Sequence, residues 1–297
     1  MDLPDRLRVV FEQGRKQRLL GYRGRFAPTP SGPLHLGNLR TALISWLQAR
    51  LQGGEWLLRI DDLDTPRIRL GAVDSALEDL QWLGLHWDGP VIMQSQRLEL
   101  YNTCLSAFRH DQLLYACRCT RRELGGRRYP GTCREMARGW GLQDGRLPAW
   151  RLKVKAVHEP CCGDLVLRRA DGFIAYHLST VVDELALGIT EVVRGSDLEV
   201  VCIAQQAVIA SLEEQSPGYR HTPLLCDPQG QKLSKRDHAA GLAPLQDQQW
   251  SPQRVVGWLA GSLGLVDQHC SLSVDELLQE MRARSVPLRS CFEDQDS

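Results

Sequence analysis

The sequence predicts an α/β protein built around a parallel sheet, and three observations support that class. Two short apolar segments, residues 22–27 and 55–61, are typical of buried strands. Apolar residues recur at helical spacing after each of them, from Leu36 to about Gly53 and again over residues 72–84. The order of strand, turn, helix, strand and helix indicates a parallel sheet, because neighbouring parallel strands need a crossover helix.

The remaining elements follow in chain order. Residues 28–33, Pro-Thr-Pro-Ser-Gly-Pro, must form a turn, because proline lacks the N–H that a helix interior or a central strand requires. The second helix should end at Gly84, since glycine favours helix C-termini. Apolar runs return at residues 173–187 and 191–194, and a helix is expected over about 198–213. The sheet is therefore predicted to resume after an interruption.

Five regions are expected along the chain. Residues 1–21 are polar and basic, and we expect a loosely held N-terminal extension. Residues 22–116 and 173–225 are the two halves of the sheet domain. Residues 117–172, rich in Arg, Gly and Cys and with little periodicity, form an insertion between them. Residues 226–297 hold a charged loop and a mainly helical C-terminal segment.

Composition narrows the class of protein further. The 297 residues carry a formal net charge of zero, so nucleic-acid binding must come from local patches. No secretory segment is expected, since residues 1–20 carry five basic side chains, and no apolar run is long enough to span a bilayer. We expect a cytoplasmic protein, in which the ten cysteines stay reduced as core residues, metal ligands or incidental thiols.

Two distant segments indicate a phosphate-binding site. His35, Gly37 and Asn38 stand where the first helix begins, and a helix N-terminus presents free N–H groups to a phosphate. Gly37 allows a nucleotide to approach the backbone closely. In the second segment, Lys232 and Lys235 flank Leu-Ser in a loop that can close over phosphates. Each segment alone also fits a helix cap or a solvated loop, and only the two together favour a nucleotide site.

These segments and their surroundings resemble class I aminoacyl-tRNA synthetases. The His35 segment stands in the place of that family's HIGH motif, and residues 232–236 in the place of its KMSKS motif. Four further segments match the glutamyl branch: Arg-Phe-Ala-Pro-Thr-Pro-Ser-Gly at 25–32, Leu-Arg-Ile-Asp-Asp-Leu-Asp at 58–64, Trp-Leu-Gly-Leu-His-Trp-Asp at 82–88 and Val-Arg-Gly-Ser-Asp at 193–197. The resemblance implies a Rossmann-like class I synthetase sheet that is split by a zinc-containing insertion.

The resemblance implies activation of L-glutamate by ATP, which Mg²⁺ accompanies. The glutamate α-carboxylate is ionised at neutral pH, so its attack on the α-phosphate needs orientation and charge stabilisation rather than a general base. The catalytic candidates are His35, Lys232 and Lys235. The candidates for ATP binding are His35, Gly37, Asn38 and Lys235.

Glutamate itself requires a cation for its side-chain carboxylate, and arginine's planar fork suits that group. By resemblance, the candidate glutamate-binding residues are Arg25, Phe26, Ala27, Pro28, Thr29, Asp61, Tyr176 and Arg194. Taken singly, the two arginines also fit salt-bridge partners and Tyr176 fits a core residue. Asp61 departs from the branch, which has Glu at this place. Its shorter side chain requires a tighter pocket or a bridging water to reach the substrate ammonium.

Three cysteines gather in the insertion, as Cys117-Arg118-Cys119 followed by Cys133. Zinc prefers thiolates in a tetrahedral shell, but this spacing alone leaves zinc open and supplies no fourth ligand. The resemblance to shortened glutamyl-synthetase-like proteins implies one structural zinc ion held by Cys117, Cys119, Tyr129 and Cys133. A phenolate is an unusual zinc ligand, and Cys161 and Cys162 are the rival ligands.

The same insertion is locally basic. Seven arginines but only two glutamates lie between residues 118 and 138. In a chain of zero net charge this asymmetry favours contact with an RNA backbone, and the alternative is a solvated basic surface.

The acceptor of the activated glutamate is inferred from length. Only 61 residues follow Arg236, whereas full-length glutamyl synthetases continue into anticodon-reading domains. With the zinc-site match, this implies the shortened family that activates glutamate without tRNA and transfers it to the queuosine base in the anticodon of tRNA(Asp). Three alternatives stay open: a compact glutamyl-tRNA synthetase charging the 3′ end of tRNA(Glu), a pantothenate-synthetase-like ligase of the same fold, and a non-catalytic RNA-binding module. We expect a monomer without membrane contact.

Overall fold

The computed structural model describes residues 3–125, 128–136, 138–225, 241–267, 269–284 and 288–292. The chain divides into two compact units, each assembled from segments that are distant in sequence. The first unit contains Met1–Leu19, Gln94–Gly188 and Val200–Pro217. The second contains Leu20–Met93, Ile189–Glu199 and Gly218–Ser297.

Parallel strands form the centre of the second unit. β1 (Arg23–Phe26) pairs with β2 (Glu55–Ile60), which pairs with the short β3 (Ile92–Met93). β7 (Glu191–Gly195) pairs in parallel with β8 (Gly218–Thr222). This second pair lies beside β1, where the Thr190 amide donates to the Arg23 carbonyl over 2.9 Å. The predicted parallel sheet is thus confirmed, and it brings β1 next to a strand about 170 residues further along the chain.

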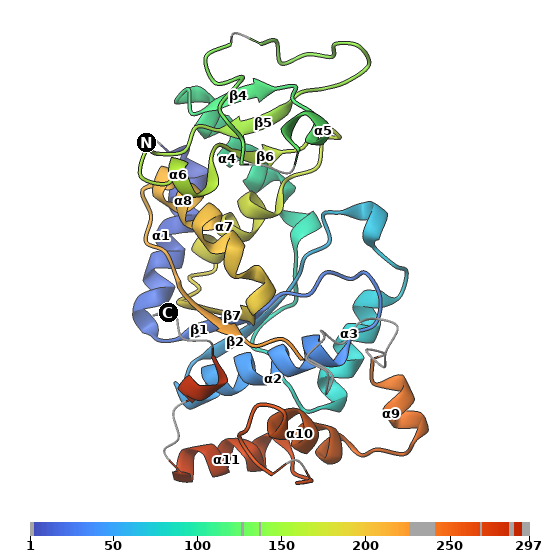
Figure 1. Cartoon of the computed structure of the whole chain (residues 1–297). Helices are drawn as coiled ribbons and strands as arrows, with labels where there is room; N and C mark the ends of the chain where they lie inside the picture. Colours follow the sequence, from blue (N-terminus) through green and yellow to red (C-terminus); the bar gives the residue numbers. More distant parts are fainter. Residues whose placement is uncertain are drawn as a thin grey trace. The chain divides into compact units, whose positions relative to one another are not determined.

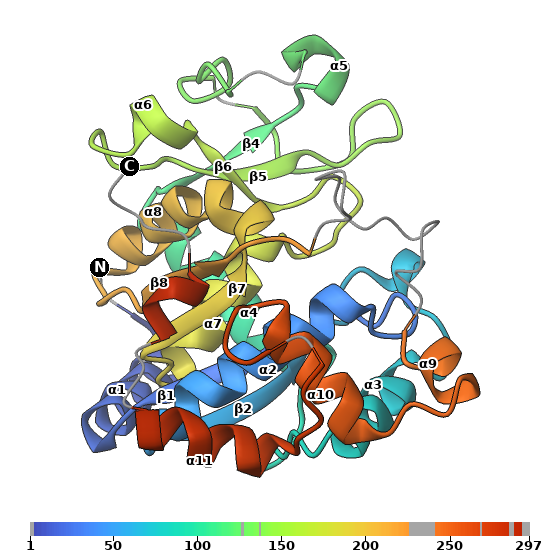
Figure 2. The same ribbon diagram turned by 60° about the horizontal axis from the view of Figure 1, so that its bottom comes forward.

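One long helix covers a face of this sheet. α2 (Leu36–Leu51) packs on β1, β2 and β7, and α10 (Pro252–Gly261) and α11 (Val274–Arg284) pack on α2 (Figure 1). Figure 2 shows α10 and α11 from below. Leu39, Leu43 and Leu47 recur every four residues on α2 and are at most 1% exposed, so they form the centre of the core.

The shorter elements of the second unit agree with the sequence expectations. α3 ends at Trp82, and Gly84 adopts the left-handed φ of +80° that follows many helices. The described part of the C-terminal segment is mainly helical, as expected. The remaining elements of this unit are α3 (Ala72–Trp82), η1 (Thr65–Arg67), α9 (Ala243–Asp247) and η4 (Leu288–Cys291).

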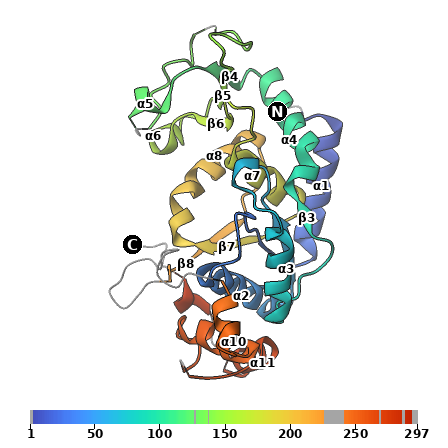
Figure 3. The ribbon, with the colours of Figure 1, turned by 90° about the vertical axis from the view of Figure 1, so that its right-hand side faces the viewer.

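The first unit combines an antiparallel sheet with helices. β4 (Leu114–Cys117), β5 (Ala149–Leu152) and β6 (Leu165–Arg168) form three antiparallel strands (Figure 3). The helices are α4 (Leu98–His110), α5 (Arg121–Leu124), α6 (Glu159–Cys162), α7 (Tyr176–Ala186) and α8 (Cys202–Leu212), with the 3-10 turn η2 (Gln94–Arg97) before α4. The turn η3 (Ser196–Val201) leads into α8, within the range expected for a helix. Strands of four residues are too short to show the alternation of apolar and polar side chains that identifies a strand. The sequence therefore indicated little structure here.

Residues 5–20 correct an expectation. In place of a loosely held extension, α1 (Asp5–Leu20) is a helix on which Leu7 and Phe11 are fully buried. Gly14 touches the backbone of α7, because a Cβ at Gly14 would lie 1.9 Å from the Leu185 carbonyl oxygen. These residues are spaced three or four apart, so a helix that is polar overall still has one narrow packing stripe.

Gly14→Ala is expected to destabilise the protein. Alanine gains about 1 kcal/mol of helix propensity, but its methyl group must push α1 away from α7, and overpacking costs about 1–3 kcal/mol or more. We expect a net loss of about 1–2 kcal/mol in urea denaturation. Gly139→Ala is the matched control, because a Cβ at that position would meet no atom within 4 Å. Equal stability of the two variants would refute the close packing of α1.

Among the described residues, no helix combines the length and the apolar character that crossing a membrane requires.

Candidate active site and metal centre

The side chains of His35 and Asn38 cap the N-terminus of α2. His35 is the N-cap: its Nδ1 accepts from the Asn38 amide over 3.2 Å, and the Asn38 side-chain oxygen accepts from the His35 amide over 3.4 Å. Because Nδ1 uses its lone pair here, the proton of the neutral ring lies on Nε2, which is then a donor. A Cβ at Gly37 would lie 3.1 Å from His35 Nδ1, so glycine leaves room for the ring. His35 therefore caps the helix and offers an N–H to an anion.

The turn before α2 is tied to the residues that follow β2. The Asp61 amide donates to the Pro28 carbonyl over 2.9 Å, and the Arg69 amide donates to the Pro30 carbonyl over 3.0 Å. The proline-rich turn supplies acceptors and few donors, so its carbonyls need amides from elsewhere. These bonds hold the carboxyl ends of β1 and β2 together, where a parallel sheet binds its ligands.

Two buried arginines lie on adjacent strands of this sheet. Arg25 on β1 and Arg194 on β7 are 4% and 3% exposed. Arg25 Nη1 donates to the Val193 carbonyl over 3.2 Å, so the Arg25 side chain reaches the residue before Arg194. Arginine's planar fork suits a carboxylate, so two buried arginines on adjacent strands are a candidate carboxylate site.

His221 on β8 orients Arg194. Arg194 Nε donates to His221 Nε2 over 3.3 Å, and its guanidinium carbon lies 4.9 Å from the centre of the Tyr219 ring. Burial and the adjacent Arg194 cation lower the pKa of His221 below its usual value. The imidazole therefore stays neutral at physiological pH and can accept the hydrogen bond.

Asp61, expected to face the substrate ammonium, already has a cation beside it. The Arg59 Nε donates to Asp61 Oδ1 over 2.6 Å and Nη2 donates to Oδ2 over 3.1 Å. Arg59 is fully buried and Asp61 is 8% exposed. The guanidinium fixes the orientation of this carboxylate and balances part of its charge.

The other predicted site residues lie in different surroundings. Phe26 is buried and stacks on Trp56, with ring centres 6.2 Å apart. Pro28 is buried, while Ala27 and Thr29 are partly exposed. Tyr176 is the first residue of α7 in the first unit and is 38% exposed. Lys232 and Lys235 fall outside the residues that the structure describes.

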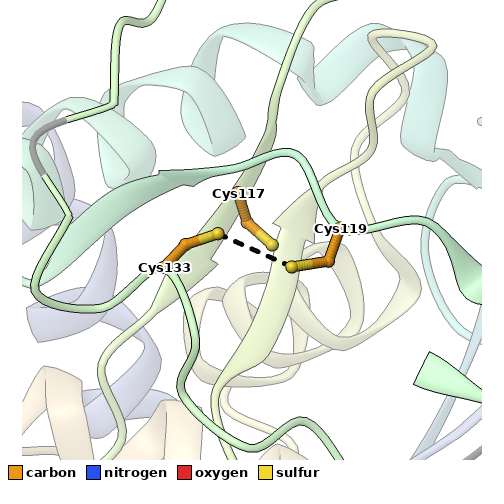
Figure 4. A group of neighbouring side chains, drawn as sticks. All are labelled: Cys117, Cys119 and Cys133. Carbon is orange, nitrogen blue, oxygen red and sulfur yellow. Dashed lines mark hydrogen bonds between the residues drawn. The ribbon is translucent and has the colours of Figure 1, made fainter. Parts of the chain in front are cut away.

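The insertion brings three cysteines and a tyrosine together. The sulfur atoms of Cys117, Cys119 and Cys133 all lie within 4.8 Å of one another (Figure 4). Cys119 Sγ lies 3.6 Å from Cys133 Sγ, and Tyr129 Oη lies 3.4 Å from Cys117 Sγ and 4.0 Å from Cys119 Sγ. A tetrahedral zinc site with Zn–S bonds of about 2.3 Å places its sulfurs about 3.8 Å apart. The four groups therefore fit a four-coordinate metal, whereas Cys161 and Cys162 lie on α6 outside this cluster.

The groups of the cluster differ in how readily they ionise, since burial raises the pKa of Cys119 to about 11 while that of Cys133 is lowered. Burial opposes ionisation of Cys133, but hydrogen bonds from Tyr129, the Arg118 amide and the other two thiols lower its pKa to about 7. The Cys133 amide donates to Tyr129 Oη over 2.7 Å, and the Arg151 guanidinium carbon lies 3.7 Å from the centre of the Tyr129 ring. Burial and the hydrogen bonds with Cys117 and Cys133 nevertheless raise the pKa of Tyr129 well above its usual value, so a metal ion would have to displace the phenol proton.

Asp164 connects the cysteine loop to the sheet. This buried carboxylate accepts from Arg134 Nε over 2.8 Å, from Arg134 Nη2 over 2.5 Å and from Tyr115 Oη over 2.6 Å. Burial opposes its ionisation, but these bonds outweigh that effect and lower the pKa of Asp164. Arg134 directly follows Cys133, so its ion pair with Asp164 fixes the backbone next to this cysteine.

Asp164→Asn is expected to destabilise the protein by roughly 2–3 kcal/mol, because it removes the buried counter-charge of Arg134 and leaves only the half-exposed Glu159 at 3.3 Å. Since the pKa of Asp164 is lowered on folding, its contribution is present above the unfolded pKa of about 4 and is lost as the pH falls below that value. Thermal denaturation at pH 7 measures the change. Asp171→Asn, which breaks an exposed pair with Arg169, should cost far less. A comparable loss in both variants would contradict this role.

Sequence reasoning missed three of these groups. Arg59 had a detectable signal, because an arginine inside the apolar run Leu-Leu-Arg-Ile needs an anionic partner when that strand is buried. His221 and Asp164 belong to no motif, and only the folded chain shows what they contact, because His221 lies on β8 beside β7 and Asp164 directly precedes β6.

Known proteins resemble this chain over most of its length. The family model "tRNA synthetases class I (E and Q), catalytic domain" matches residues 22–139 and 150–260. A glutamyl-Q tRNA(Asp) synthetase of Prochlorococcus marinus strain MIT 9303 is 57% identical over 97% of both chains. A protein of the same name from Nocardia farcinica is 45% identical over 83% of this chain and 86% of its own. A solved glutamate tRNA ligase from Elizabethkingia meningosepticum superposes with a TM-score of 0.73 at 25% identity, and the chain covers 66% of that protein's length.

Proposed function

The chain belongs to the glutamyl-Q tRNA(Asp) synthetases, within the class I tRNA synthetases (E and Q), and on that premise we propose a two-step reaction. First, the α-carboxylate of L-glutamate attacks the α-phosphate of ATP, which forms glutamyl-adenylate and releases pyrophosphate without tRNA. Then a hydroxyl of the queuosine base in the anticodon of tRNA(Asp) attacks the activated carbonyl. An ester forms, AMP leaves and the hydroxyl proton passes to solvent. The observation that carries this proposal is the identity of 57% and 56%, over 97% of the chain, with two relatives of that name.

We propose that the N-terminus of α2 receives ATP. The Nε2 donor of His35 and the positive end of the α2 helix dipole suit a phosphate whose charge spreads during the attack. Lys232 and Lys235 are proposed to act on the same phosphates, and Mg²⁺ accompanies the ATP. None of these groups transfers a proton, because both nucleophile and leaving group are anionic.

We propose that Arg25 and Arg194 bind the side-chain carboxylate of glutamate. Their burial on adjacent strands supports this role, because a guanidinium in a dry site distinguishes a carboxylate from an amide by its charge. Asp61, oriented by Arg59, is proposed to bind the ammonium. Phe26, Ala27, Pro28, Thr29 and Tyr176 complete the proposed glutamate site.

We further propose one structural zinc ion at Cys117, Cys119, Tyr129 and Cys133. The distances between the three thiols and the phenol oxygen support it, and a bound ion would cross-link a loop that has few apolar residues. The protein is proposed to act in the cytoplasm as a monomer.

The test begins with pyrophosphate exchange in the presence of glutamate and the absence of RNA. The proposed reaction predicts robust exchange, followed by transfer of labelled glutamate to tRNA(Asp) only when queuosine is present. A compact glutamyl-tRNA synthetase would instead need tRNA(Glu) for activation. Equal labelling of tRNA(Asp) with and without queuosine would refute the proposed acceptor.

A further inference from the structure

Two arginines and two tryptophans gather at the small antiparallel sheet of the first unit. Trp150 on β5 and Arg168 on β6 are paired across the two strands, and the Arg168 guanidinium carbon lies 4.9 Å from the centre of the Trp150 ring. Trp140 meets Trp150 edge to face at 5.0 Å. Arg109, at the end of α4, stands 4.5 Å from the Trp140 ring and 5.7 Å from the Trp150 ring. We call these four residues the Trp platform.

The platform is accessible and carries positive charge. Arg109 is exposed, and Trp140, Trp150 and Arg168 are partly exposed. Two guanidinium groups lie over the same indole of Trp150. Within the described part of the first unit, neither arginine has a carboxylate at ion-pair distance, and Arg168 donates only to the Gly172 carbonyl over 3.4 Å. Two like charges gathered without a counter-ion favour an anionic ligand.

Arg118 holds the loop that carries Trp140. Its guanidinium donates to the carbonyls of Gly139, Gly141 and Arg146 over 3.2, 2.6 and 2.9 Å. Arg118 lies between Cys117 and Cys119, so the backbone that positions it belongs to the proposed metal site. Arg118 thus fixes the loop through three backbone carbonyls, and the loop's Trp140 side chain packs against Trp150.

Other arginines of the insertion are already occupied. Arg134 binds Asp164, Arg128 donates to the carbonyls of Glu159 and Pro160, and Arg151 donates to the Asp164 carbonyl. The seven arginines between residues 118 and 138 therefore overstate the charge that the insertion offers to RNA. The platform adds two arginines outside that range, Arg109 and Arg168.

We propose that the Trp platform binds unpaired nucleotides of the tRNA, with a base stacked on Trp140 and neighbouring phosphates bound by Arg109 and Arg168. A guanidinium near an indole face carries more N–H donors than the ring can engage, and those donors suit a phosphate oxygen. Exposed aromatic faces between cations are the usual means of binding unstacked bases, whereas paired RNA offers no free base face. This inference rests on the proposed function, because it assigns the loop of the anticodon arm to this surface.

The binding test uses a fluorescein-labelled anticodon stem-loop of tRNA(Asp) and the full-length chain. Trp140→Ala is expected to weaken binding about 5- to 150-fold, the range of one lost base stack. Trp140→Phe keeps a ring face and should retain most of the affinity. Arg109→Gln should weaken binding and reduce the slope of log K against log salt by about one, because one phosphate contact is lost.

Two controls separate stacking from general charge and from loss of structure. Arg254→Gln removes an exposed arginine that stands 3.9 Å from the Trp250 ring in the second unit, and it should bind the stem-loop like the wild type. A fully paired duplex of the same length should not distinguish Trp140→Ala from Trp140→Phe. Wild-type affinity of both Trp140→Ala and Arg109→Gln for the stem-loop would overturn the proposal. Pyrophosphate exchange by the wild-type chain needs no RNA, so failure of the proposed function would be seen there separately.

Discussion

Arg194→Ala should lower kcat/KM for glutamate in pyrophosphate exchange by about 100- to 1,000-fold. Truncating one member of a buried, hydrogen-bonded charge pair costs about 3–4 kcal/mol, and each 1.4 kcal/mol is tenfold. Arg194 is 3% exposed, so water cannot replace its guanidinium beside the substrate carboxylate. Steady-state exchange at varied glutamate and saturating ATP measures the effect.

Two further variants identify the cause of that loss. Arg194→Lys keeps the charge but loses the planar fork and the bond to His221, so its activity should lie between those of the wild type and of Arg194→Ala. Arg220→Ala removes an arginine from the same strand pair whose side chain is 45% exposed and pairs with Glu191, so it should change kcat/KM less than twofold. If Arg194→Ala raised the KM for ATP and left that for glutamate unchanged, the proposed role of Arg194 would be wrong.

Cys133→Ser should remove the metal and loosen the insertion. A structural zinc ion supplies part of the folding free energy directly, because its ligands are not preassembled in the unfolded chain. Among the described residues, a small buried cluster of Tyr115, Cys117, Tyr129 and Cys133 surrounds the proposed metal, so few apolar side chains support this loop. We expect metal content to fall from one zinc per chain to almost none, and proteolysis within residues 117–172 to become much faster.

Cys161→Ser is the matched control for that experiment. Cys161 is exposed on α6 and lies outside the cluster, so this variant should keep its zinc and its resistance to protease. Tyr129→Phe removes the phenol oxygen alone and should weaken zinc retention against a chelator without abolishing it. Loss of zinc from Cys161→Ser, or full retention in Cys133→Ser, would exclude the proposed ligand set.

The fold could be predicted where the sequence carried long periodic signals. α2 and α3, the strands β1 and β2, and the turn between β1 and α2 lie within two or three residues of their expected ends. α1 was missed because three contacts, at Leu7, Phe11 and Gly14, are enough to pack a helix whose other residues are polar. The antiparallel sheet of the insertion was missed because each of its strands has four residues.

By itself, the sequence determined the chemistry of the candidate site, since His35, Arg25, Arg194 and the three cysteines occur in motifs whose order is visible along the chain. The folded chain decided most of their partners. It placed Arg25 beside β7, gave Arg194 the neutral acceptor His221 and brought Asp164 to Arg134 next to the cysteines, whereas Arg59 lies only two residues before its partner Asp61. Motifs report residues that are near in sequence, whereas charges and ligands are balanced by residues that are near in space. Val193 and His221 come from strands that pair only after the chain has folded, and Asp164 directly precedes β6.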